Sequence, residues 1–392
     1  MSEKIEFIDL KAQYASLKEI INHRVQTVLD HGQYIMGPEV QELENQLQTY
    51  TGATHCITVA SGTEALLISL MALGIKAGDE VITTPFTFAA TAEVIVLLGA
   101  TPVFVDINQD TCNINAALIE QAITSKTKAI MPVSLYGQVA DMDEINTIAA
   151  KHGNIPVIED AAQSFGATYK GKKSCNLSTI GCTSFFPSKT LGCYGDGGAI
   201  FTNNSDLATA MREIRVHGQE KRYHHTRIGV GGRMDTLQCS IVLAKLTQFD
   251  WEIERRIEAG QYYQELLRPL KGITLPATLH DRTCVWGQFT VFVKNRDALC
   301  DQLKKENIPT AIHYPVPLHQ QPAYEKISRV SGSLDNANTA SALVMSLPMH
   351  PYIEKKTQEK IIHALNSVKH TMPSWFNYLK ELTAMDIDKG VD

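Results

Sequence analysis

Residues 182–198 read CTSFFPSKTLGCYGDGG, in which a short apolar run ends in a serine, a proline and one lysine before a glycine-rich loop. Such a run, bounded by turn-forming residues, is typical of a buried strand whose end projects one side chain. That side chain is Lys189. Because most lysines are exposed surface charges, the stretch alone leaves open whether Lys189 is catalytic or simply solvated.

The sequence around this stretch alternates between strand-like and helix-like segments from residue 55 to about residue 203. This alternation favours an α/β fold, with a mainly parallel sheet flanked by helices. The predicted strands span residues 55–60, 80–84, 102–106, 128–133, 156–160, 183–186 and 199–202. The helices predicted between them include residues 64–73, 90–98, 116–123 and 142–151.

At 392 residues the chain exceeds the size at which one hydrophobic core keeps growing, so we expect two domains. The large domain would span residues 1–245 and the small α+β domain residues 246–370. Residues 371–392 form a polar tail to which we assign no role.

Helical spacing of apolar residues predicts two long helices outside the alternating region. One spans residues 12–30 and ends at Gly32, and the other spans residues 236–267 and leads into the small domain. In that domain, residues 285–293 alternate like a half-buried strand, and residues 297–306 are predicted to be helical.

The composition limits the classes of partner. The chain has 36 basic and 42 acidic residues, a net charge of −6, and no basic run, so we do not expect it to bind nucleic acid. It lacks a signal-type segment and an apolar run long enough for membrane insertion, which predicts a soluble, cytoplasmic protein. Its eight cysteines contain no C-x-x-C pair, so we expect reduced thiols and no metal site, with Cys193 as a packed thiol.

The ends of the predicted strands are the places to search for a site, because ligands bind at the carboxyl ends of strands in such sheets. Ser61, Gly62 and Thr63 follow the first strand and open a helix. Ser61 and Glu64 have the spacing of a capping box, while the helix N-terminus also suits a phosphate group. The two interpretations are compatible.

Two further strand ends carry candidate residues. Phe88 follows the second strand, where an aromatic ring could belong either to the core or to a cofactor contact. The fifth strand ends in Glu159 and Asp160, of which only one can face a given site because strand side chains alternate. Asp160 could cap the next helix, or it could pair with a protonated ring nitrogen, with Gln163 near a ring oxygen.

Together these segments resemble the pyridoxal-phosphate sugar aminotransferases of the DegT/DnrJ type, which have the type I (aspartate aminotransferase-like) fold. The resemblance covers about residues 5–352 and rests on residues 37–39, 60–63, 87–88, 135–138, 159–163, Ser184, Lys189 and residues 233–235. Residues 132–137, 175–178, 222–225 and 346–351 most resemble the members that act on UDP-2-acetamido-2-deoxy-3-oxo-glucuronate.

The resemblance implies roles for seven cofactor-binding residues. Lys189 would hold pyridoxal 5′-phosphate as a Schiff base and later move a proton, and Asp160 would keep the pyridine nitrogen protonated. The other five would bind the ring or the phosphate: Gln163 at the ring hydroxyl, Phe88 stacked on the ring, and Gly62, Thr63 and Ser184 around the phosphate.

For the sugar carboxylate, the resemblance points to Arg233, His313 and Tyr314. A planar guanidinium suits a carboxylate because it can bind both oxygen atoms. The alternatives are a domain-bridging ion pair for Arg233 and a His-Tyr pair packed under Pro315. The chain departs from the family at Gly231, where most members have an asparagine that reaches the phosphate of the partner subunit in a homodimer.

The implied reaction is a transamination in which L-glutamate converts the cofactor to pyridoxamine 5′-phosphate and the 3-oxo group of the UDP-sugar then accepts the amine. The product would serve lipopolysaccharide O-antigen synthesis, and the enzyme would be a homodimer with active sites near the subunit interface. Three alternatives remain: an aminotransferase for a 4-oxo or another 3-oxo nucleotide sugar, a non-catalytic regulatory protein, and a sugar 3-dehydratase. Lys189 argues against the dehydratases, which have histidine at that position.

Overall fold

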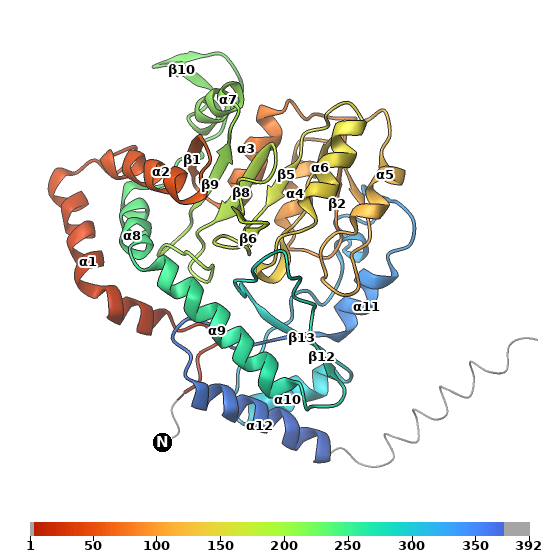
Figure 1. The fold of residues 1–392 in the computed structure, drawn as a ribbon. Helices are drawn as coiled ribbons and strands as arrows, with labels where there is room; N and C mark the ends of the chain where they lie inside the picture. The colour runs from red at the N-terminus through yellow and green to blue at the C-terminus, as the bar shows by residue number, and fades with distance from the viewer. Residues whose placement is uncertain (1–3, 372–392) are drawn as a thin grey trace, which may run out of the picture.

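The computed structural model describes residues 4–371, and a mixed sheet forms its centre (Figure 1). Two bridges, Ile130 to Val157 and Val133 to Asp160, join two four-stranded halves. Within this sheet β9 runs antiparallel to its two neighbours, whereas the other pairings are parallel. The strand order is β1 (His55–Val59), β9 (Gly198–Thr202), β8 (Ile180–Ser184), β5 (Ile158–Asp160), β4 (Thr127–Ile130), β2 (Glu80–Thr83), β3 (Thr101–Phe104) and β14 (Arg329–Val330).

Helices cover the sheet through two apolar cores, as the alternating pattern predicts. One core includes side chains of α2 (Pro38–Thr51), α5 (Ile119–Ala122), α6 (Met142–Lys151) and α8 (Thr236–Leu246). The other includes side chains of α3 (Gly62–Ala72), α4 (Ala90–Leu97) and α7 (Ser205–Arg215). The predicted α/β class with a mainly parallel sheet is therefore confirmed.

The first helix, α1 (Leu10–His31), packs against α8. It ends at Gly32, whose φ of 70° lies in the left-handed region that favours glycine. The predicted helix and its stop are both confirmed.

A second, three-stranded antiparallel sheet lies in the C-terminal part of the chain. It consists of β12 (Ile273–Thr274), β13 (Phe289–Val293) and β15 (Val344–Leu347). Its core includes side chains of α9 (Phe249–Leu267), α10 (Arg296–Lys305) and α12 (Lys355–Thr371). In Figure 1, α10 and α12 lie at the bottom, and α9 runs from the middle of the molecule down to them. Ile5 belongs to this core, so the start of the chain packs with its C-terminal part.

The predicted continuous helix over residues 236–267 is wrong. The structure breaks it into α8 and α9 at Thr247 and Gln248, and Gln248 has φ −115° and ψ 1°. The side-chain amide of Gln248 donates a hydrogen bond of 2.9 Å to the hydroxyl of Tyr352. The strand predicted at residues 285–293 is also shorter in the structure, because the pairing with β15 is confined to β13.

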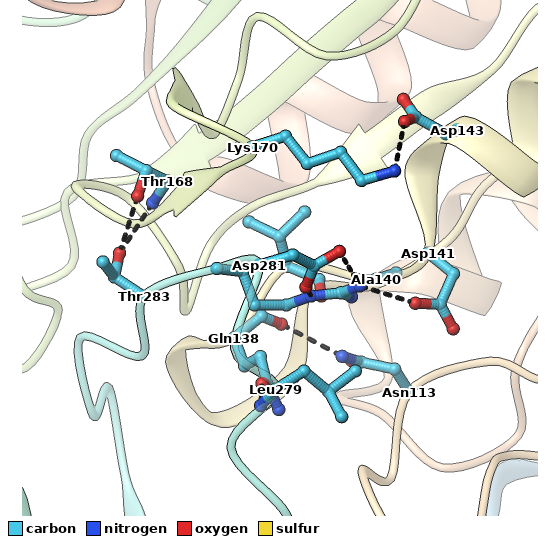
Figure 2. A network of polar contacts seen from close by, with 12 residues as sticks. Asn113, Gln138, Ala140, Asp141, Asp143, Thr168, Lys170, Leu279, Asp281 and Thr283 are labelled. Atoms are coloured by element: carbon cyan, nitrogen blue, oxygen red, sulfur yellow. Dashed lines mark hydrogen bonds and ion pairs between the residues drawn. The ribbon is translucent and has the colours of Figure 1, made fainter.

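A polar cluster joins the segment before β13 to the large sheet region (Figure 2). Arg282 pairs with Asp141 at 2.8 Å and donates to the carbonyl of Val139 at 2.8 Å. Nearby, the amide of Thr168 donates to the hydroxyl of Thr283 at 2.8 Å. These contacts position the chain that enters the second sheet.

The remaining short elements are β6 (Thr168–Tyr169), β7 (Lys172–Lys173), β10 (Gln219–Lys221), β11 (His224–His225), α11 (Asp335–Leu343) and the 3-10 turns Ala116–Leu118, Leu135–Gly137 and Leu318–Gln320. Across residues 4–371, none of the helices combines the length and the apolar character needed to cross a membrane. The predicted tail lies outside the described residues apart from residue 371, and the domain boundary at residue 245 stays a prediction.

Candidate active site

A cavity of about 510 Å³ lies at the carboxyl ends of the central strands. It brings together nine of the ten residues predicted from the sequence: Gly62, Thr63, Phe88, Asp160, Gln163, Ser184, Lys189, His313 and Tyr314. Arg233, the tenth, is half-buried and does not line this cavity.

Lys189 is held on the loop that follows β8. Its backbone N–H donates to the carbonyl of Phe186 at 2.9 Å, which closes a turn through Pro187. Burial lowers the pKa of the Lys189 amine, and the nearby carboxylate of Asp160 opposes this shift. The lowered pKa increases the fraction of neutral amine, the form that can attack a carbonyl or accept a proton.

Asp160 ends β5 with its carboxylate in the cavity wall. The hydroxyl of Thr91 donates to Oδ2 at 2.9 Å, and the N–H of Ala162 donates to Oδ1 at 3.2 Å. Burial raises the pKa of Asp160, while these two hydrogen bonds and Lys189 lower it. No helix begins in the turn after Asp160, so the alternative interpretation as a helix cap is wrong.

Glu159 has no access to the cavity, as the strand alternation predicts. Its carboxylate is fully buried and accepts hydrogen bonds from the hydroxyls of Ser134 and Ser174 and from the N–H of Cys175, at 2.8–3.0 Å. Burial raises the pKa of Glu159, and the three hydrogen bonds oppose the shift. Neighbouring acids therefore face opposite sides of β5.

The Gln163 side chain is fixed at both ends. Its Oε1 accepts a hydrogen bond from the backbone N–H of Tyr136 at 2.8 Å, and its Nε2 donates to the hydroxyl of Tyr314 at 3.1 Å. The hydroxyl of Tyr136 in turn donates to the carbonyl of His313. Gln163 thereby connects the sheet edge to the loop that carries His313 and Tyr314.

The N-terminus of α3 forms the opposite corner of the cavity. Ser61 accepts a hydrogen bond from the N–H of Glu64 at 3.0 Å, which confirms the Ser61 half of the predicted capping box, whereas Oε2 of Glu64 has no hydrogen-bond partner in the described residues. A β-carbon on Gly62 would lie 2.6 Å from Cβ of Ser184, so only glycine lets the helix end approach β8 this closely. The corner combines free backbone N–H groups with a serine hydroxyl, which suits a phosphate group.

Phe88 and His313 complete the wall. Phe88 is 58% exposed and lines the cavity, whereas Phe86 is fully buried in the core. Of these two rings on the same loop, Phe88 is therefore free to contact a cofactor and Phe86 belongs to the core. The ring of His313 lies 2.9 Å from the hydroxyl of Ser346. Burial, with a smaller contribution from Lys189, lowers the pKa of His313 to about 4, so the ring is neutral at pH 7.

Three wall residues, Gln288, Phe186 and Asp196, are not predicted from the sequence pattern. Neither is Thr91, which does not line the cavity but donates a hydrogen bond directly to Asp160. The search for polar residues after each strand covers the loop between β2 and α4. Thr91 lies just beyond this loop, in the first turn of α4. Gln288 comes from the C-terminal part of the chain, where no local pattern distinguishes it.

Arg233 and Gly231 lie together outside the cavity. A β-carbon on Gly231 would lie 3.9 Å from NH2 of Arg233 and 3.1 Å from the ring of His217. Gly231 itself is exposed and bridges to Val216. A side chain at position 231 would therefore lie next to His217 and Arg233.

Comparisons with known proteins agree with this geometry. A profile of the DegT/DnrJ/EryC1/StrS aminotransferase family matches residues 15–366. The chain belongs to this family.

A family member from Pseudomonas aeruginosa, named UDP-2-acetamido-2-deoxy-3-oxo-D-glucuronate aminotransferase, is 55% identical over 363 residues, which cover 93% of this chain and 100% of the relative. A family aminotransferase from Brucella abortus has a crystal structure with a TM-score of 0.90 and 41% identity, covering 93% of this chain and 99% of that one.

The NtdA protein of Bacillus subtilis, solved with bound PMP, has a TM-score of 0.82 and 31% identity, and the match covers 92% of this chain and 83% of that one. Family membership confirms the predicted type I fold, the aminotransferase class and the pyridoxal-phosphate cofactor.

Proposed function

We propose that this chain moves an amino group from L-glutamate to C3 of UDP-2-acetamido-2-deoxy-3-oxo-glucuronate. The observation that carries the proposal is that Lys189, Asp160 and the Gly62–Ser184 corner meet in one cavity. The sugar is inferred from the Pseudomonas aeruginosa relative, whose name specifies it and which the chain matches over its full length.

The residues of the cavity fit pyridoxal phosphate. The N-terminus of α3 and Ser184 suit its phosphate, the Asp160 carboxylate suits its ring nitrogen, and the exposed ring of Phe88 offers a stacking face. When bound, the cofactor supplies an electron sink for the carbon atoms that exchange the amine.

The protein groups have separate tasks in this reaction. Lys189 Nζ would hold the cofactor covalently, and its amine would take the proton from the α-carbon of the amino acid, a task for which its lowered pKa is suited. Asp160 would hold the ring nitrogen in its protonated form, because a cationic nitrogen favours the ionised carboxylate and is stabilised by it in turn. Two hydrogen bonds orient this carboxylate. Tyr314 and Gln163 close the wall behind them.

For the sugar carboxylate we propose Arg233, His313 and Tyr314. His313 is neutral at pH 7, so it would bind through hydrogen bonds, and Arg233 would provide the positive charge. Because Arg233 lies outside the cavity of its own chain, we assign it to the cavity of a second copy in a homodimer. We further propose a cytoplasmic enzyme whose product enters lipopolysaccharide O-antigen synthesis.

The alternative substrate is a nucleotide sugar with a 4-oxo group or a different 3-oxo group, because the cofactor residues are the same for these reactions. The test is to incubate the protein with L-glutamate and a panel of UDP- and dTDP-linked 3-oxo and 4-oxo sugars and to detect the aminated products by mass spectrometry. We expect amination of the 3-oxo uronate. Amination of 4-oxo sugars alone would refute the substrate, and no transfer from glutamate in any reaction would favour a regulatory protein.

Arg233→Ala tests the proposed charge contact. We expect the KM for the 3-oxo uronate to rise by on the order of tenfold or more, with an unchanged glutamate half-reaction. Arg233→Lys, which keeps the charge but loses the planar fork, would recover part of the affinity. An unchanged KM in Arg233→Ala would exclude Arg233 as the carboxylate ligand.

A further inference from the structure

A second, much smaller cavity also borders Lys189. Its wall includes Lys189, Gln13 of α1, Arg256 of α9 and His350 in the loop after β15. Lys189 lines both cavities, so it forms part of the wall between them. The small cavity leaves about 10 Å³ for the centre of a water-sized molecule.

Three residues of this wall each carry a buried polar atom that has no hydrogen-bond partner within the described part of the chain. These atoms are Oε1 of Gln13, Nε of Arg256 and Nδ1 of His350, on side chains that are only 7%, 3% and 6% exposed. A buried polar atom without a partner is costly, and groups of such atoms around one cavity indicate a bound molecule that satisfies them.

The hydrogen-bonding chemistry of these atoms selects water. Gln13 Oε1 is an acceptor and Arg256 Nε–H is a donor. Burial lowers the pKa of His350 to about 4, so its ring is neutral and Nδ1 accepts or donates according to the tautomer, and water can serve either. A single water can donate to two acceptors and accept from one donor. A cation is disfavoured beside Arg256, and an anion cannot receive a hydrogen bond from the amide oxygen of Gln13.

The surrounding groups hold this arrangement in place. Glu252 accepts two hydrogen bonds from Nε2 of Gln13 at 2.9 Å and one from the hydroxyl of Tyr352 at 2.8 Å, so the free Oε1 of Gln13 has a fixed direction. Arg256 donates to the carbonyl of Trp286 at 3.2 Å. The charged groups nearest His350 are Arg256, Asp9 and Glu6, and Arg256 is also next to Glu252.

We propose that Gln13, Arg256 and His350 hold one buried water molecule beside Lys189, and that His350 is a positioning residue for this lysine. The water links three distant segments of the chain to the loop that carries Lys189. Because Lys189 also lines the small cavity, a water there would limit how far its side chain can withdraw from the large one. The second part of the inference depends on the proposed role of Lys189, whereas the water site itself does not.

The test compares two substitutions of His350 with a matched histidine elsewhere. His350→Leu removes the ring nitrogens, and His350→Gln keeps polar atoms in a side chain of similar reach. His319→Leu is the control, because His319 Nδ1 is also buried without a partner in the described residues and lies outside both cavities. All three variants and the wild type are loaded with pyridoxal phosphate.

Crystal structures at a resolution that shows ordered water provide the first readout. We expect one water within hydrogen-bond distance of the three atoms in the wild type and in His319→Leu, and none in His350→Leu. An empty cavity in the wild type would overturn the proposal.

The second readout is the pH midpoint of the absorbance change of the bound cofactor, together with the rate of the glutamate half-reaction. For His350→Leu we expect a shifted midpoint and a roughly tenfold slower half-reaction at unchanged glutamate KM, with partial recovery in His350→Gln. Wild-type values in His350→Leu would overturn the positioning role. If Lys189→Ala carries the same cofactor absorbance as the wild type, the proposed function fails instead, whatever the water site shows.

Discussion

Gln163 and Tyr314 lie 151 residues apart in the chain, yet the side-chain amide of Gln163 donates a hydrogen bond of 3.1 Å to the tyrosine hydroxyl. Gln163 follows β5 in the large sheet, and Tyr314 precedes the proline-rich segment that leads to Leu318–Gln320. This contact therefore joins the two parts of the chain at the cavity wall.

Removal of this hydrogen bond should weaken the wall. We expect Tyr314→Phe to lower the free energy of unfolding by about 1 kcal/mol, because the amide of Gln163 loses its partner. Tyr262→Phe is the control, since its hydroxyl bonds to Glu359 at the surface. Chemical denaturation of both variants measures the difference, and equal stabilities would contradict the expectation.

Lys189→Ala should abolish turnover. We expect a loss on the order of a thousandfold or more in kcat, because one amine both attaches the cofactor and moves the proton. Reduction with borohydride followed by peptide mass spectrometry should label Lys189 in the wild type only. Lys170→Ala, which removes an exposed partner of Asp143, should keep both the label and the activity.

Asp160→Asn should separate stability from activity. The folded state raises the pKa of Asp160, so the cofactor-free protein loses stability as pH rises from the ordinary aspartate value through the raised one. At pH 7 we expect the asparagine variant to be about 1 kcal/mol more stable without cofactor, and roughly a hundredfold slower with it. Lower stability of the cofactor-free variant would refute the first half of this prediction.

His313 should make stability fall in mild acid. Its pKa in the folded protein is about 4, below the usual value, so the unfolded chain binds a proton first as pH falls. The contribution of His313 to the free energy of unfolding is complete above about pH 6.5 and is lost as pH falls toward 4. For this partly exposed ring we expect the loss to be roughly 2 kcal/mol. Denaturation of wild type and His313→Asn at about pH 7 and pH 5 should show a smaller decrease in the variant. If the free energy of unfolding falls equally in the wild type and in His313→Asn, the acid sensitivity comes from other groups, such as His350.

Gly62→Ala should weaken cofactor binding. The added methyl group would press against Cβ of Ser184 at 2.6 Å, so the end of α3 must move away from β8. We expect at least a roughly tenfold higher Kd for pyridoxal phosphate by fluorescence titration. Gly195→Ala is the control, because there the nearest atoms belong to the flexible side chain of Gln238.

The strand pattern predicted the sheet and most of the cavity, because a parallel sheet places its strand ends along one edge. Lys189, Asp160 and the corner around Gly62 follow from that rule. Gln288 does not, since only the packing of the second sheet brings it to the wall. Only the family resemblance points to Arg233, and within one chain this residue lies outside the cavity.

The break between α8 and α9 could not be predicted from local periodicity. Apolar spacing continues through Gln248, and the helix ends there although no glycine or proline stands at Thr247 or Gln248. The same limit applies to the small cavity, because α1, α9 and the loop at His350 meet only in the folded chain.

The buried carboxylate of Glu159 also determines the register of β5. Three donors from two separate loops bind its carboxylate. If β5 slipped by one residue, Glu159 would lose these hydrogen bonds, and Glu159 and Asp160 would each move to the opposite face of the sheet. A residue outside the cavity thus decides which of two neighbouring carboxylates lines it. Insertions in β5 should accordingly be far less tolerated than changes of side chain.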